Sequence, residues 1–279
     1  MKVLIVGGDS LIGRALTAAL RASGHEVTPT SYRRPLPRGA RYLDLSNPDH
    51  EVTAGFDCIV LCAAVVTRAA CEADPALAHA VNVVAPLALA KPVLAKSAQV
   101  VFLSTSIVLG GDAPHLPVDS PYAPFDAYSS QKAEAEQRLR ALPGAEEALS
   151  ILRLVKVLDA SCGVVAEWAK AIEKQRAITP FYDLVTAPIT VDNVTATVEN
   201  LIARRQLGIY HLSGVEHTYA DVAFRLGEAL GWPDALIKPI RGRERNAVAA
   251  QNPNHASLAA NPLIPFDDVI RKLAEQISQ

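Results

Sequence analysis

The sequence predicts an α/β fold built on a doubly wound parallel sheet, with a smaller, mostly C-terminal second domain. Three observations indicate this class of fold. Short apolar runs alternate with helical patterns, several of the runs are continuous, and a glycine-rich turn follows the first run. Continuous Val, Ile and Leu runs suit parallel strands that are covered on both faces. Their alternation with helices is typical of a doubly wound sheet.

The predicted elements follow in chain order. Strands are predicted at residues 3–6, 26–30, 41–43, 58–62, 100–104, 150–155 and 209–212. Helices are predicted from apolar spacing and capping residues at 11–20, from 74 through 87, at 127–142, from 192 to 201, at 219–230 and at 266–277. Residues 1–158 form the first predicted domain, to which 188–213 return, and residues 159–187 and 214–279 form the second.

Composition excludes several classes of function. The 279 residues include 27 basic and 29 acidic side chains, and this near-neutral balance favours neither a nucleic-acid nor a membrane partner. The apolar run Val3–Val6 is too short for a signal peptide, and no uninterrupted apolar stretch approaches the ~20 residues of a membrane span, so a cytoplasmic location is expected. The four cysteines lack CxxC spacing, which favours reduced thiols and no metal site.

The glycine-rich turn between the first strand and the first helix is typical of a Rossmann-type dinucleotide site. Small residues let the backbone approach a pyrophosphate, and the helix N-terminus presents free N–H groups to it. The middle glycine of the usual pattern is replaced by serine, which could be tolerated, bond a phosphate or weaken cofactor binding. The predicted cofactor-binding residues of this turn are Gly7, Ser10, Leu11, Ile12 and Gly13.

The end of the second strand predicts the choice of dinucleotide. An acid there would bind the adenosine ribose of NAD, but residues 28–34 contain none. Arg33 and Arg34 could instead pair with a 2′-phosphate, so NADP(H) is favoured over NAD(H). The alternative is a solvated basic loop. Asp44 and Leu45 end the third strand, where they could meet the adenine.

The candidate catalytic residues are Thr105, Tyr128 and Lys132. Thr105 ends a buried strand, and ligands collect at the carboxyl ends of strands in open α/β sheets. Tyr128 and Lys132 are one helical turn apart, so they share a helix face. A nearby ammonium is expected to lower the phenol's pKa, so that Tyr128 exchanges a proton while a nicotinamide exchanges a hydride.

The residues of these motifs and their order along the chain resemble those of the extended short-chain dehydrogenase/reductases, and most of all those of the dTDP-4-dehydrorhamnose reductase group. The resemblance covers most of the chain. It is carried by residues 7–13, 62–64, 72–75 leading to 81–82, 103–108, 128–132 and 208–214.

The resemblance implies roles for these residues. Tyr128 would be the acid, Lys132 would bind the nicotinamide ribose and tune Tyr128, and Thr105 would polarise the carbonyl of a nucleotide sugar. Further cofactor contacts are implied for Cys62, Ala63, Ala64 and Asn82. A homodimer paired through the helices at 75–94 and 127–142 is also implied.

The substrate side departs from the sugar reductases. Ser106 stands where they usually have Asp, and Lys156 where they often have Trp. The candidate substrate residues are Thr67, Ser106, Lys156 and Arg243. Two alternatives to a keto-sugar reductase therefore stay open: an epimerase or dehydratase of the same fold, and a non-catalytic, NADP-binding regulatory subunit.

Overall fold

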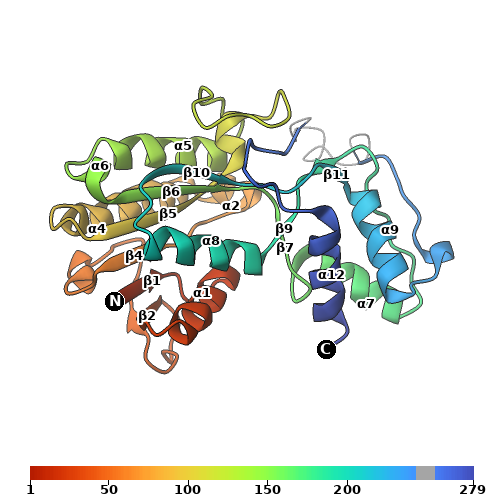
Figure 1. The fold of residues 1–279 in the computed structure, drawn as a ribbon, viewed down its shortest axis with the longest axis horizontal. Coiled ribbons are helices and arrows are strands. Elements are labelled where there is room, and N and C mark those ends of the chain that lie inside the picture. Colours follow the sequence, from red (N-terminus) through yellow and green to blue (C-terminus); the bar gives the residue numbers. More distant parts are fainter. Residues whose placement is uncertain (243–254) are drawn as a thin grey trace. The chain divides into compact units, whose positions relative to one another are not determined.

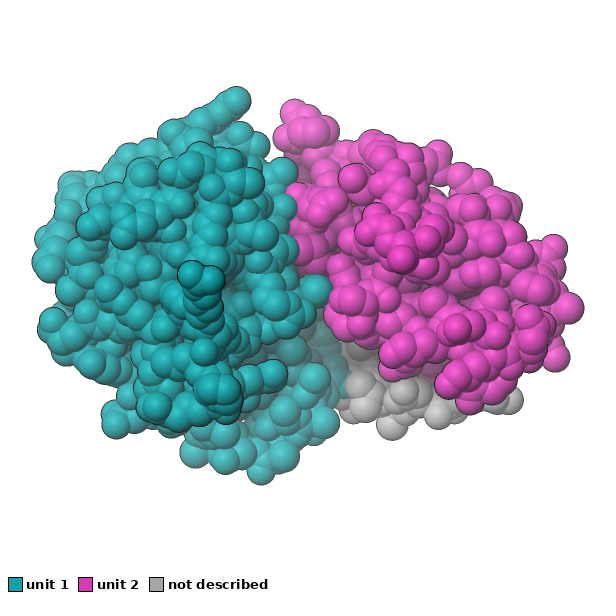
Figure 2. Space-filling model, turned by 90° about the horizontal axis from the view of Figure 1, so that it is seen from below, with its two compact units in different colours: residues 1–108, 121–153, 194–210 teal, residues 109–120, 154–193, 211–279 magenta. Residues whose placement is uncertain are grey.

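The computed structural model describes residues 1–242 and 255–279, which divide into two compact units (Figure 1 and Figure 2). Unit 1 comprises Met1–Val108, Pro121–Arg153 and Val194–Tyr210, and unit 2 comprises Leu109–Ser120, Leu154–Asn193 and His211–Gln279. The sequence places residues 109–120 in the first domain, whereas the structure groups them with unit 2. Here Leu116 pairs with Leu258 in a parallel bridge, and the His115 N–H donates to Ser257 Oγ at 2.9 Å.

A seven-stranded sheet forms the centre of unit 1 and confirms the predicted fold class. Its strands are β1 (Lys2–Val6), β2 (Glu26–Ser31), β3 (Arg41–Tyr42), β4 (Cys58–Leu61), β5 (Gln99–Thr105), β6 (Leu149–Leu154) and β10 (Gly208–Leu212). Their order is β10-β6-β5-β4-β1-β2-β3, and the pairings from β5 to β3 are parallel. The strand order reverses between β1 and β4, which is where such sheets bind ligands.

Helices cover both faces of this sheet (Figure 1). On one face, α1 (Leu11–Ala22) lies beside α8 (Val191–Ala203), and Ser23 Oγ donates a hydrogen bond to Glu199 between them. The other face carries α3 (Pro75–His79), α4 (Ala85–Leu94), α5 (Ala127–Arg140) and α6 (Ala145–Ala148). The helix predicted from residue 74 is interrupted by a π-helical turn at Ala80–Val84, and α2 (Arg68–Ala73) was not predicted.

The helical run Pro75–Leu94 is the one segment of the described chain that is long and apolar enough to cross a membrane by length and composition. Half of its apolar window is buried inside the structure. Leu89, Val93 and Leu94 belong to the core that packs against the sheet. A buried core helix meets the same two criteria, so this run is weak evidence for a span.

Among the described residues of unit 2, three helices share one core through their apolar faces: α7 (Gly163–Glu173), α9 (Tyr219–Leu230) and α12 (Phe266–Ile277). Two pairs of short strands accompany them: β7 (Val157–Leu158) with β9 (Ile189–Thr190), and β8 (Val185–Thr186) with β11 (His217–Thr218). Helices α9 and α12 were predicted at the observed bounds. Helix α7 and most of the short strands were not.

The interior of unit 1 contains a buried ion pair. Arg153 on β6 and Glu136 on α5 are 1% and 0% exposed, and Arg153 Nη2 lies 2.8 Å from Glu136 Oε2. The carboxylate also accepts hydrogen bonds from Ser104 Oγ and, at 2.9 Å, from Tyr122 Oη. Removing one partner of such a pair leaves an uncompensated buried charge.

We therefore expect Arg153→Met to lower the free energy of unfolding by about 3–5 kcal/mol. The matched control is Arg138→Met, because Arg138 is about half exposed and pairs with Glu134 at 2.8 Å on the surface of α5. That change should cost less than about 1 kcal/mol. Urea unfolding of both variants measures the difference, and equal losses would contradict the role of the buried pair.

Candidate active site

The glycine turn is held against the end of β2 by its main chain. The Gly8 N–H donates to the Thr30 carbonyl at 2.9 Å, and the Gly7 N–H donates to Thr30 Oγ1 at 3.1 Å. Gly7 has a φ of +88°, and a Cβ there would lie 2.6 Å from Ala63 Cβ. A Cβ on Gly13 would lie 2.1 Å from the Gly7 carbonyl oxygen. The turn therefore requires glycine at both positions.

Ser10 caps α1. Its Oγ accepts a hydrogen bond from the Gly13 N–H at 3.0 Å and donates one to the Gly7 carbonyl at 2.8 Å. Its φ of −70° does not need glycine, so serine is accommodated without backbone strain. The hydroxyl proton is already used within the turn, which leaves anion binding to free main-chain N–H groups at the start of α1, such as those of Leu11 and Ile12.

A cavity of about 690 Å³ opens at the carboxyl ends of β1, β2, β3 and β4. Its volume is in the range of small-molecule and cofactor sites. Ten predicted cofactor residues line it: Gly7, Ser10, Leu11, Ile12, Arg33, Asp44, Leu45, Cys62, Ala63 and Ala64. The cavity, its glycine turn and its position at the reversal of strand order together fit the adenosine and pyrophosphate part of a dinucleotide.

Five predicted cofactor residues are not part of that lining: Gly13, Arg34, Asn82, Tyr128 and Lys132. Gly13 instead closes the turn, and Arg34 lies over the Tyr42 ring at 4.5 Å. Asn82 is buried in the π-helical turn, where Oδ1 accepts from the Val65 N–H at 2.8 Å and Nδ2 donates to the Val65 carbonyl at 3.0 Å. Since Val65 lines the cavity, Asn82 shapes the cavity wall without forming it.

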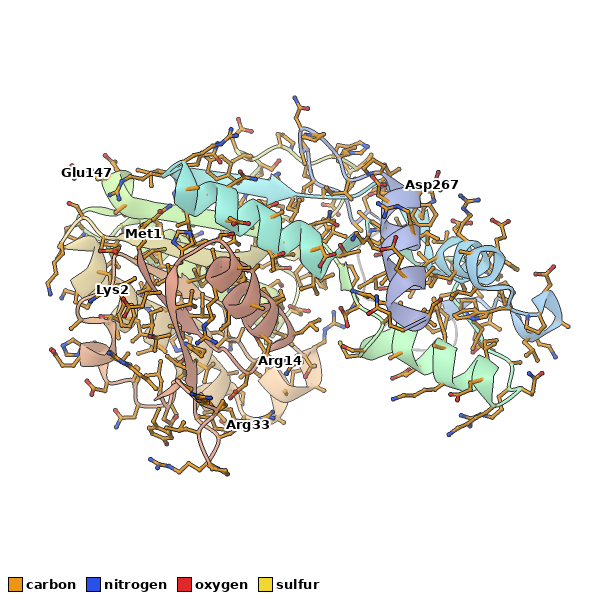
Figure 3. All side chains as sticks on the ribbon, turned by 60° about the horizontal axis from the view of Figure 1, so that its bottom comes forward. Met1, Lys2, Arg14, Arg33, Glu147 and Asp267 are labelled. Carbon is orange, nitrogen blue, oxygen red and sulfur yellow. The ribbon has the colours of Figure 1, made fainter. Side chains whose placement is uncertain are left out.

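An acid that was not among the site residues predicted from the sequence lies at the end of β2. Asp9 lines the cavity, and its carboxylate accepts a hydrogen bond from Ser31 Oγ, at the last residue of β2. The Arg33 N–H donates to the same Ser31 Oγ at 3.0 Å. In Figure 3 the labelled Arg14 and Arg33 lie toward this carboxyl end of the strands, away from Met1 and Lys2 at the amino end. Local sequence around β2 gives no signal for Asp9, since the contact joins residues 22 apart.

Helix α5 begins at a well-defined cap. Asp126 Oδ1 accepts from the Ser129 N–H at 2.7 Å and forms a capping box with it. Arg68 Nε, from α2, donates to Asp126 Oδ2 at 3.1 Å. This partly buried ion pair joins the start of α5 to the segment that follows β4. Tyr128, two residues after Asp126, is partly buried there.

Lys132 is 2% exposed and is held against β5. Its Nζ donates to the Leu103 carbonyl at 2.6 Å and lies 3.7 Å from the centre of the Phe102 ring. Burial lowers the pKa of the Lys132 ammonium to about 7, although the nearby carboxylate of Glu136 favours the charged form. Since Cys62 lines the cavity, Lys132 lies near its wall.

The predicted direction of the Tyr128 pKa is wrong. Burial raises the pKa of the phenol well above its ordinary value, and the nearby Cys71 and Asp126 raise it further. The ammonium of Lys132 is bonded to the Leu103 carbonyl instead. At neutral pH the phenol therefore keeps its proton, which is the form that a proton donor needs.

The remaining candidates lie in different places. Thr105 is the last residue of β5, two residues after the carbonyl that binds Lys132, and Ser106 begins a 3₁₀ helix (Ser106–Leu109). Thr67 caps α2, accepting from the Ala70 N–H at 3.2 Å. Lys156 is exposed in unit 2, and Arg243 lies outside the described residues. Glu136 was not among the residues predicted from the sequence, and it lies on α5 one helical turn after Lys132.

Within the described part of the chain, no group of three or more His, Cys, Asp or Glu side chains could hold a metal ion. All four cysteines are free. Burial raises the pKa of the Cys62 thiol to about 12, so it is protonated at neutral pH and is a poor nucleophile.

A family model described as the RmlD substrate binding domain matches residues 1–272. Among curated proteins, the chain is 28% identical over 269 residues to dTDP-4-dehydrorhamnose reductase of Mycolicibacterium smegmatis, covering 93% of this chain and 78% of that protein. It is 26% identical over 276 residues to methionine adenosyltransferase 2 subunit beta of Pongo abelii, covering 94% and 81% of the two chains.

A solved structure has the same fold. The dTDP-4-dehydrorhamnose reductase of Bacillus anthracis in complex with NADP matches with a TM-score of 0.85 and 20% identity, over 98% of each chain.

The lowered pKa of Lys132 predicts a pH-dependent contribution to stability. Between about pH 7 and the ordinary lysine value of 10.5, the unfolded chain binds a proton that the folded chain does not. Raising the pH through this interval therefore favours the folded state, by up to about 1.4 kcal/mol per pH unit. We expect the free energy of unfolding of the unsubstituted protein to rise relative to Lys132→Met over this interval.

Urea unfolding at about pH 7, 8 and 9 provides the measurement. The control is Lys91→Met, which removes an exposed lysine from α4 and should leave the pH dependence unchanged. A gap between the unsubstituted protein and Lys132→Met that stays constant over these pH values would show that Lys132 does not titrate in this range.

Proposed function

The chain belongs to the family of the RmlD substrate binding domain, and we propose that it is an NAD(P)-dependent oxidoreductase that reduces a keto group on a nucleotide-activated sugar. The observation that carries the proposal is the buried Lys132, held against the end of β5 near Thr105 and one turn after Tyr128. The similarity to a dTDP-4-dehydrorhamnose reductase over most of the chain supports this class of substrate.

The chemistry assigned to the residues is a proton transfer. When bound, a nicotinamide dinucleotide supplies the hydride that adds to the keto carbon. Tyr128 Oη donates its proton to the keto oxygen, which becomes the hydroxyl of the product. The Thr105 hydroxyl donates a hydrogen bond to the same oxygen, and the Lys132 ammonium stabilises the phenolate that Tyr128 becomes.

The cofactor is expected to be NADP(H) rather than NAD(H). Arg33 lines the cavity beside the end of β2, where its guanidinium can pair with a 2′-phosphate. Arg34 adds positive charge nearby. Neighbours of the same fold were solved with NADP or with NAD, which supports a nicotinamide dinucleotide as the cofactor. We assign substrate binding to unit 2. Homodimer formation and a cytoplasmic location stay predictions.

A regulatory subunit is the second candidate function. The observation that favours it is the similarity over 94% of the chain to methionine adenosyltransferase 2 subunit beta. Such a subunit would bind the dinucleotide without turnover. An epimerase or dehydratase of the same fold is less favoured, because Ser106 supplies no acid after β5.

The first experiment replaces the proposed acid. Tyr128→Phe should lower kcat for NADPH-dependent reduction of a panel of nucleotide-linked keto sugars by about 10²–10⁴-fold, because it removes only the transferred proton. The Kd of NADPH should stay within a few-fold of its original value. Stopped assays of product and fluorescence titration of NADPH measure the two quantities.

The control is Tyr210→Phe. The Tyr210 hydroxyl bonds to the Leu207 carbonyl at 3.1 Å on β10, so this change should leave kcat near its original value. Full activity of Tyr128→Phe would reject the assigned role. If the unsubstituted protein binds NADPH but reduces no member of the panel, the regulatory candidate takes its place.

A second experiment tests the preference for NADP(H). Replacing Arg33 and Arg34 together by Ala should weaken NADPH binding at least about tenfold while changing NADH binding much less, because only NADPH carries the 2′-phosphate. Titration calorimetry with both dinucleotides measures this. Tighter binding of NADH than of NADPH to the unsubstituted protein would overturn the preference.

A further inference from the structure

The acid that selects NAD in a Rossmann-type site normally stands at the end of the second strand. In this chain the end of β2 has no acid of its own, but the fold brings one there from the glycine turn. Asp9 and Ser31 both line the 690 Å³ cavity, and Ser31 Oγ donates a hydrogen bond to the Asp9 carboxylate.

The position of Asp9 is built into the fold. The two hydrogen bonds from Gly7 and Gly8 to Thr30 tie the turn to the end of β2, so residue 9 lies beside residue 31. The Arg33 N–H holds Ser31 Oγ from the other side at 3.0 Å. The carboxylate of Asp9 is therefore oriented by an anchored partner.

The charge of Asp9 is left available at this site. Within the described residues, its one contact with a cationic side chain is through the main chain, where Arg14 Nη1 donates to the Asp9 carbonyl at 2.7 Å. The carboxylate accepts a neutral hydroxyl instead. An oriented carboxylate can accept a hydrogen bond from a ribose hydroxyl, whereas it repels a phosphate placed at the same carbon.

We propose that Asp9 is a specificity-determining residue of the adenosine ribose site: its carboxylate accepts a hydrogen bond from the 2′-hydroxyl of NAD(H) and opposes the 2′-phosphate of NADP(H). It acts against Arg33 and Arg34, so the preference of this chain is set by opposed charges. The inference rests on the proposed dinucleotide binding and adds the residue that limits selection of NADP(H).

Binding measurements on the full chain test this inference without a sugar substrate. Asp9→Asn keeps the side-chain shape and removes the charge. It should tighten binding of NADP⁺ at least about tenfold and weaken binding of NAD⁺. The Kd of adenosine 2′,5′-bisphosphate should change in the same direction as that of NADP⁺, and the Kd of AMP in the same direction as that of NAD⁺. These two fragments differ only in the 2′-phosphate.

Two further variants keep the result interpretable. Asp9→Ser should change the ratio of the two Kd values in the same direction, and serves if Asp9→Asn fails to unfold cooperatively. Glu26→Gln removes the same charge from the exposed amino end of β2 and should leave the ratio of the two Kd values within about twofold of its original value.

A ratio that changes no more in the Asp9 variants than in Glu26→Gln would overturn the role of Asp9 while leaving the proposed function intact. If the unsubstituted protein binds neither dinucleotide, the proposed function and this inference both fail.

Discussion

The docking of α5 on the end of β5 is the constraint on which the candidate active site depends. Three buried polar links make it: Lys132 to the Leu103 carbonyl, Ser104 to Glu136, and Glu136 to Arg153 on β6. Residues 128, 132 and 136 lie on one face of the helix, so these links also determine which way Tyr128 points. Each residue turns an α-helix by about 100°, and a shift of one position would turn that face away from the strand end.

The same links set the charge at the site. Glu136 is paired with Arg153, and Lys132 one turn before it is almost completely buried. Burial lowers the pKa of Lys132 to about 7, although the carboxylate of Glu136 favours the charged form. Burial acts on Tyr128 in the opposite sense and keeps the phenol protonated. Burial thus favours the neutral form of both side chains, which lie one helical turn apart on α5.

The sequence was sufficient for the sheet and for the glycine turn, because both are encoded locally by continuous apolar runs and by residues that allow close approach. It was not sufficient where the structure depends on contacts between distant residues. Asp9 reaches the end of β2 only through the folding of the turn. Asn82 accepts a hydrogen bond from the Val65 N–H, and it lies in a π-helical turn that the spacing of apolar residues does not predict. The direction of the Tyr128 pKa was missed because helical spacing gives proximity to Lys132 but says nothing about burial.

The buried charges also bear on the choice between an enzyme and a regulatory subunit. Packing alone would not favour them, since a buried ion pair is often no more stabilising than apolar side chains of similar size. Elsewhere α5 packs on the sheet with such residues, as Ala135 and Leu139 do. A chain that only bound a dinucleotide would need the turn, the cavity and a group for the nicotinamide ribose, but it would have no need of the phenol of Tyr128 one helical turn before the buried Lys132. Burial of Lys132 costs free energy one helical turn from the phenol that we propose as the proton donor, and a strongly perturbed titratable group at such a place favours catalysis.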